Sequence, residues 1–456
     1  MHQLTSLLLI AIASAGFAAE RPTAFPGAEG FGRFARGGRG GDVYAVTSLA
    51  DDGTGSLRDG LRTIRRGTPR TIVFRVSGTI NLKKELRVDG VAGLTIAGQT
   101  SPGGIAIADR CLRLTRCSDI IIRHLRLRLG DRLKTSDDVI SIGDDKGTCR
   151  DIILDHVSAS WGVDGIMDVY SVSDFTLQWC MFGEALNNST HYKREPHAML
   201  MSFRTIKGNV SLHHNLLFSS RDRHPTLGGG DPKRSSSAAI FDFRQNVIYN
   251  WEGACNLATG IFNVENNYWR PGPNTRPYEK SLPIAPKAEA QDVTRGRLIG
   301  NIFEGQASWS ADNYLAFQWG TRGGKYVGEV TRDKFVIGED PVAAEDRPST
   351  RSPHEAYELV LTKAGAGFPR DGADERIVTG IRSKTNRRID SQVEAGGWPT
   401  FETPPPPEDR DADGIPDEWE KANGLNPADP EDRNRLSPAG RTMLEDYLSF
   451  LAGDKS

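Results

Sequence analysis

Between residues 71 and 305 the sequence repeats a short apolar run that is often β-branched, then a polar turn, then another apolar run. Aligning the runs puts an asparagine at the same place in four successive repeats, namely Asn215, Asn246, Asn267 and Asn301. Such a repeat is typical of a solenoid, in which each unit buries its apolar face only by stacking on its neighbours. The sequence therefore predicts a parallel solenoid, and the unequal spacing of the asparagines predicts loops of unequal length on one side of it.

The asparagine column has a physical meaning in such a coil. Asparagine tolerates left-handed backbone angles and its amide can bond neighbouring main chain, so it suits a tight bend. We expect the stacked amides to extend these bonds from coil to coil. The alternative is a β-sandwich in which the asparagines align by chance, but its strands would alternate more sharply between polar and apolar residues. The position before the column holds a mixed set: His124, His156, Trp179, His214, Gln245, Asn266 and Gly300.

Composition supports many turns and excludes some functions. The chain has 49 glycines and 25 prolines but only 6 methionines, which disfavours an all-helical fold. Its formal net charge of −2 gives no overall attraction to nucleic acid or to an anionic membrane, and we expect neither as a partner. Five cysteines leave at least one unpaired; Cys111 and Cys117 form either a local disulfide or part of a set of buried thiols.

The ends of the chain differ from the middle. An apolar run at residues 7–13, followed by small residues, predicts a signal peptide over residues 1–18 and secretion to the periplasm or the extracellular space. No later stretch is apolar and long enough to cross a bilayer. We expect the solenoid domain with its loop-rich C-terminal part to occupy residues 19–400, and a proline-rich linker with a small tail to occupy residues 401–456. The glycine-rich segment 24–41 is expected to be a loop.

A calcium-loop motif lies in the tail. Residues 409–420 fit D-x-D-x-D-G-x-x-x-x-x-E, with a glycine at the turn position. The preceding prolines cannot supply the first helix of an EF-hand, so the loop resembles those of dockerin-like and thrombospondin-type-3-like modules. We expect a structural calcium site here, and the alternative is a solvated acidic linker. The expected ligands are the acidic side chains of the motif: Asp409, Asp411, Asp413, Asp417 and Glu420.

A second acidic group lies within the repeats. Asp164 and Asp168 are four residues apart, and Asp137 and Asp138 lie one coil earlier. Stacked coils would bring these carboxylates together, where they repel one another unless a hard divalent cation neutralises them. The alternative is an ordinary acidic surface, because acidic pairs are common on surfaces.

The segments around these residues resemble motifs of the pectate lyases of polysaccharide lyase family 1. Residues 153–158 (I-L-D-H-V-S) are similar to the family's W-I-D-H-C-S strand, residues 164–168 to its D-G-x-x-D element and residues 138–140 to its D-A-I element. The resemblance covers residues 24–305, with a further patch at 396–399. It implies an all-β, right-handed, single-stranded parallel β-helix with long loops on one side, and calcium held by Asp138, Asp164 and Asp168. The role of Asp137 stays open.

Residues 223–225 (R-H-P) resemble the first half of the family motif R-x-P-x-x-R, which implies that Arg223 is the catalytic base. The second arginine is replaced by Gly228, and Arg221 or Arg234 is a candidate for the lost cation. His197 falls where the family has a lysine that holds the substrate's carboxylate, and Lys193 is nearby. The expected substrate contacts are Lys193, His197, Arg221 and His224.

The resemblance implies a monomeric enzyme that cleaves α-1,4-linked polygalacturonate, or pectin, by β-elimination. The proton at carbon 5 becomes acidic when calcium draws charge from the adjacent carboxylate. Arginine is normally protonated, so Arg223 can act as a base only beside the cation and out of water, which predicts an alkaline optimum. From the residues alone, a histidine such as His224 would be the expected base.

Two other functions fit parts of the sequence. A hydrolytic β-helix of the polygalacturonase type would use paired aspartates such as Asp137 and Asp138 with water, although that family's G-H-G and R-I-K elements are absent from the sequence. A non-catalytic, carbohydrate-binding β-helix would need neither Arg223 nor the aspartates. Only a lyase forms a 4,5-unsaturated uronide, whose ultraviolet absorbance separates the three functions.

Overall fold

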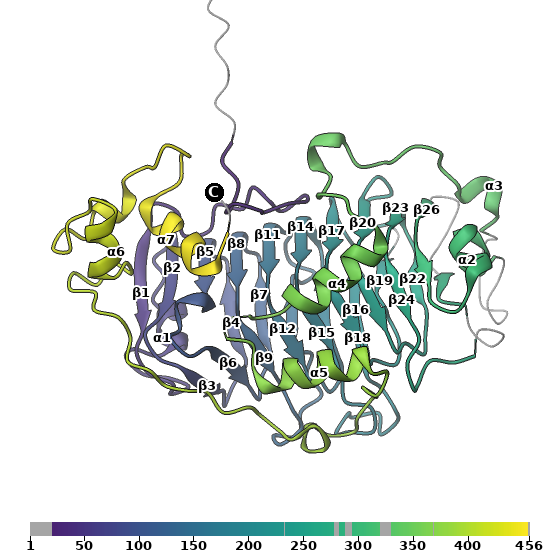
Figure 1. Cartoon of the computed structure of the whole chain (residues 1–456), viewed down its shortest axis with the longest axis horizontal. Coiled ribbons are helices and arrows are strands. Elements are labelled where there is room, and N and C mark those ends of the chain that lie inside the picture. Colours follow the sequence, from purple (N-terminus) through teal and green to yellow (C-terminus); the bar gives the residue numbers. More distant parts are fainter. Residues whose placement is uncertain are drawn as a thin grey trace, which may run out of the picture.

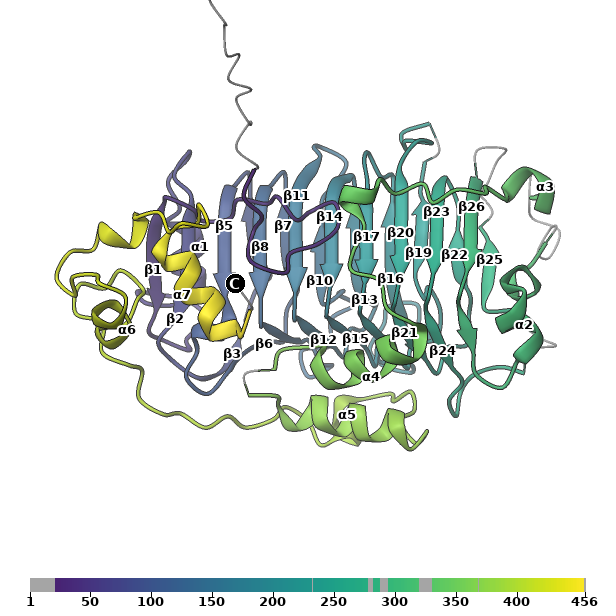
Figure 2. The same ribbon diagram turned by 45° about the horizontal axis from the view of Figure 1, so that its top comes forward.

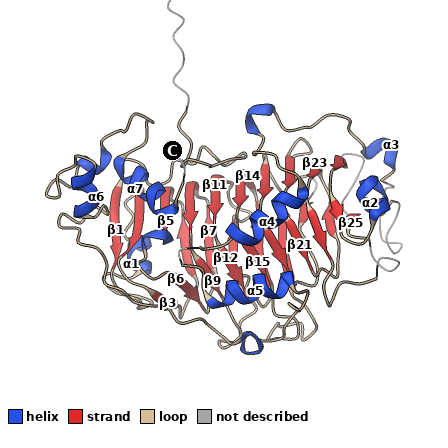
Figure 3. Cartoon of the chain, in the orientation of Figure 1, coloured by secondary structure: helices blue, strands red, loops and turns tan. Residues whose placement is uncertain are grey.

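The structure is a computed structural model that describes residues 21–231, 233–277, 282–287, 294–319, 330–367 and 369–454. Over these ranges the chain forms a right-handed parallel β-helix whose three sheets run side by side along its length (Figures 1 and 3). The predicted signal peptide, residues 1–18, lies outside the described residues. No helix in the described ranges is long and apolar enough to cross a membrane.

Sheet A contains the apolar runs found in the sequence. Its strands, in spatial order, are β1 (Asp42–Val46), β2 (Arg70–Phe74), β5 (Ala92–Ala97), β8 (Ser118–Arg123), β11 (Cys149–Asp155), β14 (Val172–Gln178), β17 (Val210–His213), β20 (Ile240–Arg244), β23 (Gly260–Glu265) and β26 (Thr294–Ile299). Each strand pairs in parallel with the next, so Ile120 lies beside Ile152, which lies beside Phe175. All three are buried, which confirms the predicted stacking of coils.

Sheets B and C complete each coil. Sheet B consists of β3 (Gly78–Asn81), β6 (Ile105–Ala108), β9 (Arg126–Arg128), β12 (Ser158–Ser160), β15 (Met181–Gly183), β18 (Leu216–Phe218), β21 (Val247–Tyr249), β24 (Tyr268–Arg270) and β27 (Ile302–Phe303). Sheet C consists of β4 (Leu86–Asp89), β7 (Leu112–Thr115), β10 (Ile140–Ile142), β13 (Gly165–Tyr170), β16 (Met199–Arg204), β19 (Thr226–Gly229), β22 (Cys255–Leu257) and β25 (Ile284–Pro286).

The asparagine column forms the predicted ladder at the corner between sheets A and B. The main-chain N–H and the side-chain amide of Asn215 both donate to Asn246 Oδ1 at 3.0 Å. The same pair of bonds joins Asn246 to Asn267 and Asn267 to Asn301. Asn313, which the repeat did not predict, ends the ladder by accepting both bonds from Asn301. Each amide therefore bonds the next coil, as expected.

The left-handed backbone lies one residue earlier than we expected. The residues before the ladder have φ values between 51° and 67°, whereas the asparagines of the ladder are not among the residues with positive φ. The bend is therefore made by the mixed column, and asparagine is required for its amide. The left-handed residues are His124, His156, Trp179, His214, Gln245, Asn266 and Gly300.

The glycine-rich segment 24–41 is a loop, as predicted, and it crosses the outer face of sheet A. Glycine is needed where the loop touches the sheet, since a Cβ on Gly32 would lie 2.3 Å from the carbonyl oxygen of Ile152. The hydroxyl of Thr176 accepts the N–H of Gly32 at 2.8 Å. A Cβ on Gly38 would likewise lie 2.3 Å from Thr71 Oγ1. Small residues therefore let this loop lie flat on the strands.

Helices pack against sheet B and against both ends of the β-helix (Figures 1 and 2). Apolar residues of α4 and α5, including Val360 and Ile377, pack on sheet B. In the tail, α7 lies over the first strands of sheet A, and α6 lies beside β1 at that end of the β-helix. The helices are α1 (Leu57–Arg62), α2 (Ala307–Ala311), α3 (Arg332–Phe335), α4 (Pro353–Lys363), α5 (Gly372–Arg382), α6 (Asp417–Ala422) and α7 (Met443–Ala452). The five cysteines are buried free thiols, so of the two alternatives for Cys111 and Cys117 the structure has the thiols.

Candidate active site

A row of polar side chains runs across the outer face of sheet C. Ser141 of β10 lies beside Asp168 of β13, which lies beside Ser202 of β16. The preceding residues of these strands, Ile140 and Met167 among them, belong to the apolar core. Because successive residues of a strand point to opposite faces, this register directs the polar row to the outside. Asp168 is thereby placed between neighbouring coils.

Asp138 and Asp164 lie at the start of the same strands, before β10 and β13. Burial raises the pKa of Asp138 well above its usual range, and the charges of Asp168 and Asp164 raise it further, while Arg223 acts in the opposite direction. These are the mutual effects expected of acidic groups that share one site. The structure therefore places the three predicted calcium ligands and the predicted base in one electrostatic cluster.

Asp164 has a histidine partner. His197 Nε2 donates to Asp164 Oδ1 at 2.7 Å, and the ring of His191 stacks on that of His197 with centroids 3.8 Å apart. Burial would raise the pKa of Asp164, but the bond from His197 and the nearby charges lower it overall. His197, predicted as a substrate contact, thus holds a predicted metal ligand in place.

Arg223 is fixed by neighbours on both sides. Its backbone is left-handed, with φ of 64°. Its N–H donates to Asp222 Oδ1 at 2.7 Å, and its carbonyl accepts the N–H of Met201 at 3.1 Å. Its Nη1 donates to Ser202 Oγ at 3.1 Å, and Ser202 lies beside Asp168 in the sheet. The guanidinium is therefore held above β16, next to the acidic residues of β13.

Arg204 is a site residue that the sequence did not single out. Its Nε donates to Asp168 Oδ1 at 3.1 Å, and its Nη2 bonds the other carboxylate oxygen. Arg204 ends β16 and belongs to no motif, so only the register of sheet C connects it with Asp168. The guanidinium of Arg204 also lies 5.8 Å from the ring centroid of Tyr170, and the guanidinium of Arg234 lies 5.7 Å from the same ring.

The other predicted substrate contacts differ in exposure. Lys193 is exposed, with its amine 5.7 Å from the ring of Tyr192. Arg221 is partly exposed, donates to the carbonyl of Pro196 and lies 3.8 Å from Glu252. The side chain of His224 is fully buried, and burial lowers its pKa to about 3. A buried ring cannot touch a polysaccharide, so the prediction that His224 contacts the substrate directly is wrong.

The donor atoms around the acidic residues suit a hard divalent cation. Asp138, Asp164 and Asp168 offer carboxylate oxygens, which calcium prefers, and their mutual repulsion is what a cation would relieve. One oxygen of Asp164 also lies within 4.8 Å of ring nitrogens of His191 and His197, a set in which imidazole nitrogens outnumber oxygens. Asp137 is joined to this region through its main chain, because its carbonyl oxygen accepts hydrogen bonds from the N–H groups of Val163 and Asp164.

The tail motif folds into a compact acidic loop at the other end of the molecule from α2 and α3 (Figure 1). Oxygens of Asp409, Asp411 and Asp413 lie within 4.8 Å of one another. A second group of this kind joins Asp413 and Glu420 to Asp432, which lies beyond the motif. Asp417, predicted as a ligand, belongs to neither group and accepts the N–H of Arg410 at 2.9 Å.

Comparison with known proteins identifies the family. No family model matches the sequence. A probable pectate lyase C of Aspergillus fumigatus is 32% identical over 460 residues, which cover 98% of this chain and 98% of the relative. The chain belongs to the pectate lyase family. A probable pectate lyase C of Emericella nidulans is 32% identical and covers 94% of this chain and 92% of the relative.

Other pectate lyases match less closely. A pectate lyase of Nicotiana tabacum is 31% identical over 176 residues, or 34% of this chain and 42% of the relative. The crystal structure of a pectate lyase of Bacillus sp. N165 in complex with trigalacturonate covers 75% of this chain and 99% of that one, at 15% identity and a TM-score of 0.48. Both fungal relatives are named probable pectate lyases, so membership of this family favours a lyase over the two alternatives, a hydrolase and a non-catalytic solenoid.

Proposed function

We propose that this pectate lyase cleaves α-1,4-linked polygalacturonate by calcium-dependent β-elimination, with Arg223 as the base. The observation that supports this most directly is that Asp138 feels the charges of Asp164, Asp168 and Arg223, which neighbouring coils supply along the strands of sheet C. A polyanionic substrate needs cations as well as a base; Arg204 lies beside Asp168 on the outer face of sheet C, and Lys193 is exposed in the loop before β16. The proposed calcium ligands are Asp138, Asp164 and Asp168.

The proposed chemistry assigns one task to each group. Calcium, when bound, draws charge from the substrate carboxylate and disfavours the protonated form of the nearby arginine. Ser202 accepts the bond from Nη1 of Arg223, so Nη2 is the nitrogen that we assign to the proton on carbon 5. The electrons of that C–H bond form the double bond between carbons 4 and 5, the bond from carbon 4 to the glycosidic oxygen breaks, and that oxygen takes a proton from solvent.

Positive side chains around the base account for substrate binding in this proposal. Lys193 and Arg221 lie in the loops before β16 and β19 and would pair with carboxylates of the polysaccharide. Arg204 donates to Asp168 in this structure. With Asp168 bound to calcium instead, the guanidinium of Arg204 would be available to a carboxylate of the substrate. His197 acts as a positioning residue, because its bond orients Asp164.

Absorbance of the unsaturated uronide tests the proposal. The purified protein is incubated with polygalacturonate at alkaline pH, with calcium or with a chelator, and the ultraviolet band is followed. We expect turnover only with calcium. Reducing ends without the band would instead indicate hydrolysis and refute the proposed elimination.

Variants then test the assignments. Arg223→Ala and Arg223→Lys should lose at least about a thousandfold in kcat, on the order of 4 kcal/mol of barrier, with calcium binding unchanged. Arg332→Ala is the control, since Arg332 is an exposed arginine of α3 that pairs with Asp312. Asp168→Asn should raise the calcium concentration for half activity at least tenfold. Near-normal kcat in both Arg223 variants would remove Arg223 from the role of base.

We also propose that the mature enzyme is an exported monomer, with residues 19–400 as the lyase domain and residues 401–456 as its tail. The apolar run followed by small residues near the N-terminus supports export. Mass spectrometry of the protein secreted by its host should find the chain beginning near residue 19. Retention of the apolar segment, or a dimer mass in light scattering, would contradict these assignments.

A further inference from the structure

The acidic loop of the tail contains buried carboxylates that the lyase chemistry does not use. Glu420 of α6 has no solvent-exposed surface, and both of its carboxylate oxygens lack a hydrogen-bond partner among the described residues. Asp413 is 1% exposed, and its Oδ2 is also unpartnered there. A buried ionised carboxylate is costly unless a hydrogen bond or a cation compensates it. Because Asp413 and Glu420 each offer an oxygen within 4.8 Å of the other, the pair points to a cation rather than to separate partners.

Asp432 links this cluster to a different segment. Its Oδ2 accepts the N–H of Asn426 at 2.7 Å and so closes the turn between α6 and the short 3-10 helix Asp432–Asn434. Its Oδ1 is buried without a partner among the described residues and lies in the same group as Asp413 and Glu420. One carboxylate therefore joins the turn to the acidic loop, outside the spacing of the motif.

The donor set selects the type of ion. The two groups, which share Asp413, contain carboxylate oxygens and neither histidine nor cysteine: Asp409, Asp411, Asp413, Glu420 and Asp432. Hard oxygen donors in a flexible loop suit calcium, whereas transition metals favour nitrogen or sulfur ligands. Magnesium would require a stricter octahedral arrangement and keeps much of its water.

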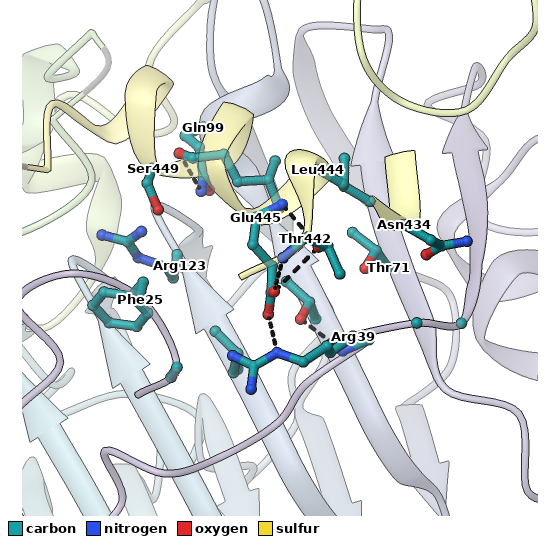
Figure 4. Close-up of a pocket in the computed structure, with 17 residues that line it drawn as sticks. Phe25, Arg39, Thr71, Gln99, Arg123, Asn434, Thr442, Leu444, Glu445 and Ser449 are labelled. Atoms are coloured by element: carbon teal, nitrogen blue, oxygen red, sulfur yellow. Dashed lines mark hydrogen bonds and ion pairs between the residues drawn. The ribbon is translucent and has the colours of Figure 1, made fainter. Parts of the chain in front are cut away.

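The tail reaches the β-helix through contacts on both sides of this site. Asp409 pairs with Arg75 at 3.1 Å, just after β2. From α7, Glu445 pairs with Arg39 at 2.7 Å, and the carbonyl of Leu448 accepts a bond from Gln99 (Figure 4). Asp454 pairs with the buried Arg123 at 2.8 Å.

An apolar layer lies beneath these polar contacts. Ile415, directly after the turn glycine of the loop, is fully buried and packs in one cluster with Leu444 and with Ala97 of sheet A. The acidic loop, α7 and the first coils thus share one small core. Ordering the loop orders the residues that dock the tail.

We propose that Asp409, Asp411, Asp413, Glu420 and Asp432 form a calcium site, separate from the proposed catalytic residues, whose occupancy holds the tail on the first coils of the β-helix. Asp432 closes the site in place of Asp417, and the ion connects α6 to the segment that leads into α7. This site is independent of the lyase chemistry, so its test does not depend on the proposed catalytic calcium.

The site is tested in the full-length protein with terbium, a calcium substitute whose luminescence is excited through a nearby tryptophan. Trp419 adjoins Glu420 in α6 and serves as that donor. All proteins carry Asp168→Asn, which weakens the proposed catalytic calcium site. We expect calcium to displace the terbium signal, Trp419→Phe to remove most of it, and Asp432→Asn and Glu420→Gln each to weaken calcium binding at least tenfold. Glu431→Gln is the matched control, because its side chain is 77% exposed beside Asp432.

Docking of the tail has its own readout. Without calcium we expect residues 401–456 to detach from the β-helix and become open to protease. The rate at which limited proteolysis cuts this tail should therefore be at least tenfold higher in chelator than in millimolar calcium. Asp432→Asn should behave like the chelated protein. The circular dichroism of the β-helix should not change. Equal calcium affinity in Asp432→Asn and Glu431→Gln would overturn the role of Asp432. Tail cleavage that is insensitive to calcium would overturn the docking role, whatever the activity on polygalacturonate.

Discussion

Removing one amide from the asparagine ladder should destabilise the protein by an amount that the structure allows us to work out. Asn246 donates to Leu212 O at 2.9 Å and to Asn267 Oδ1 at 3.0 Å, and it accepts two bonds from Asn215 at 3.0 Å. All four bonds are buried, and Asn246→Ala removes them together. At about 1 kcal/mol net for each bond, the free energy of unfolding should fall by about 4 kcal/mol.

Urea unfolding followed by circular dichroism measures this loss. Asn188→Ala is the control, since Asn188 is exposed and its amide bonds only Asp390 at 3.3 Å, so we expect less than about 1 kcal/mol. Asn246→Asp keeps the side-chain volume but places an acceptor against Leu212 O, and it should cost at least as much as the alanine. A loss below about 1 kcal/mol in Asn246→Ala, or a neutral Asn246→Asp, would show that the ladder does not stabilise the coils.

Three further predictions concern buried polar groups. Ser202→Ala should lower kcat about tenfold without changing calcium affinity, because one bond to the charged Arg223 is worth about 1.5 kcal/mol; an unchanged kcat would exclude this positioning role. Glu184→Gln should cost about 2 kcal/mol in urea unfolding, because buried Glu184 pairs with Arg376 of α5 at 2.6 Å; an equal midpoint would contradict the pairing. His224 has a folded pKa of about 3 owing to burial, against about 6.5 unfolded, so stability is lost as pH falls below about 6.5. His224→Leu should remove about 2 kcal/mol of that loss at pH 5, and parallel pH profiles for the two proteins would refute it.

The sequence predicted the coil because the coil repeats. The apolar runs of sheet A and the amides of Asn215 to Asn301 recur once in each turn, so aligning them recovers the register that the strands adopt. It did not predict the left-handed residues before the ladder, because that column is mixed: Asn266 and Gly300 suit positive φ, but Trp179 and Gln245 give no signal for it. There the stacked coils, rather than residue type, set the backbone.

The candidate site was predictable only where it carried a motif. Asp164 and Asp168 share a short segment, and the resemblance named Arg223 with them. Arg204 reaches Asp168 from the next coil, across 36 residues whose path depends on a loop of no regular length. Asp432 joins its loop through a turn in the same way. Such contacts depend on how long each loop is and where it returns, which residue spacing does not encode.

The arrangement separates the part of each coil that stabilises the fold from the part that carries the chemistry. The ladder lies at the corner between sheets A and B, where a buried amide bonds the next coil. The proposed catalytic groups lie on or beside sheet C, and each coil supplies only one or two of them, from β10, β13 and β16 to the segment before β19. Their mutual positions therefore depend on the spacing of stacked strands, about 4.8 Å. A ladder substitution that leaves the coils stacked should lower the stability while leaving kcat unchanged. A fall in kcat in a still folded Asn246→Ala protein would mean that the corner and sheet C do not act separately.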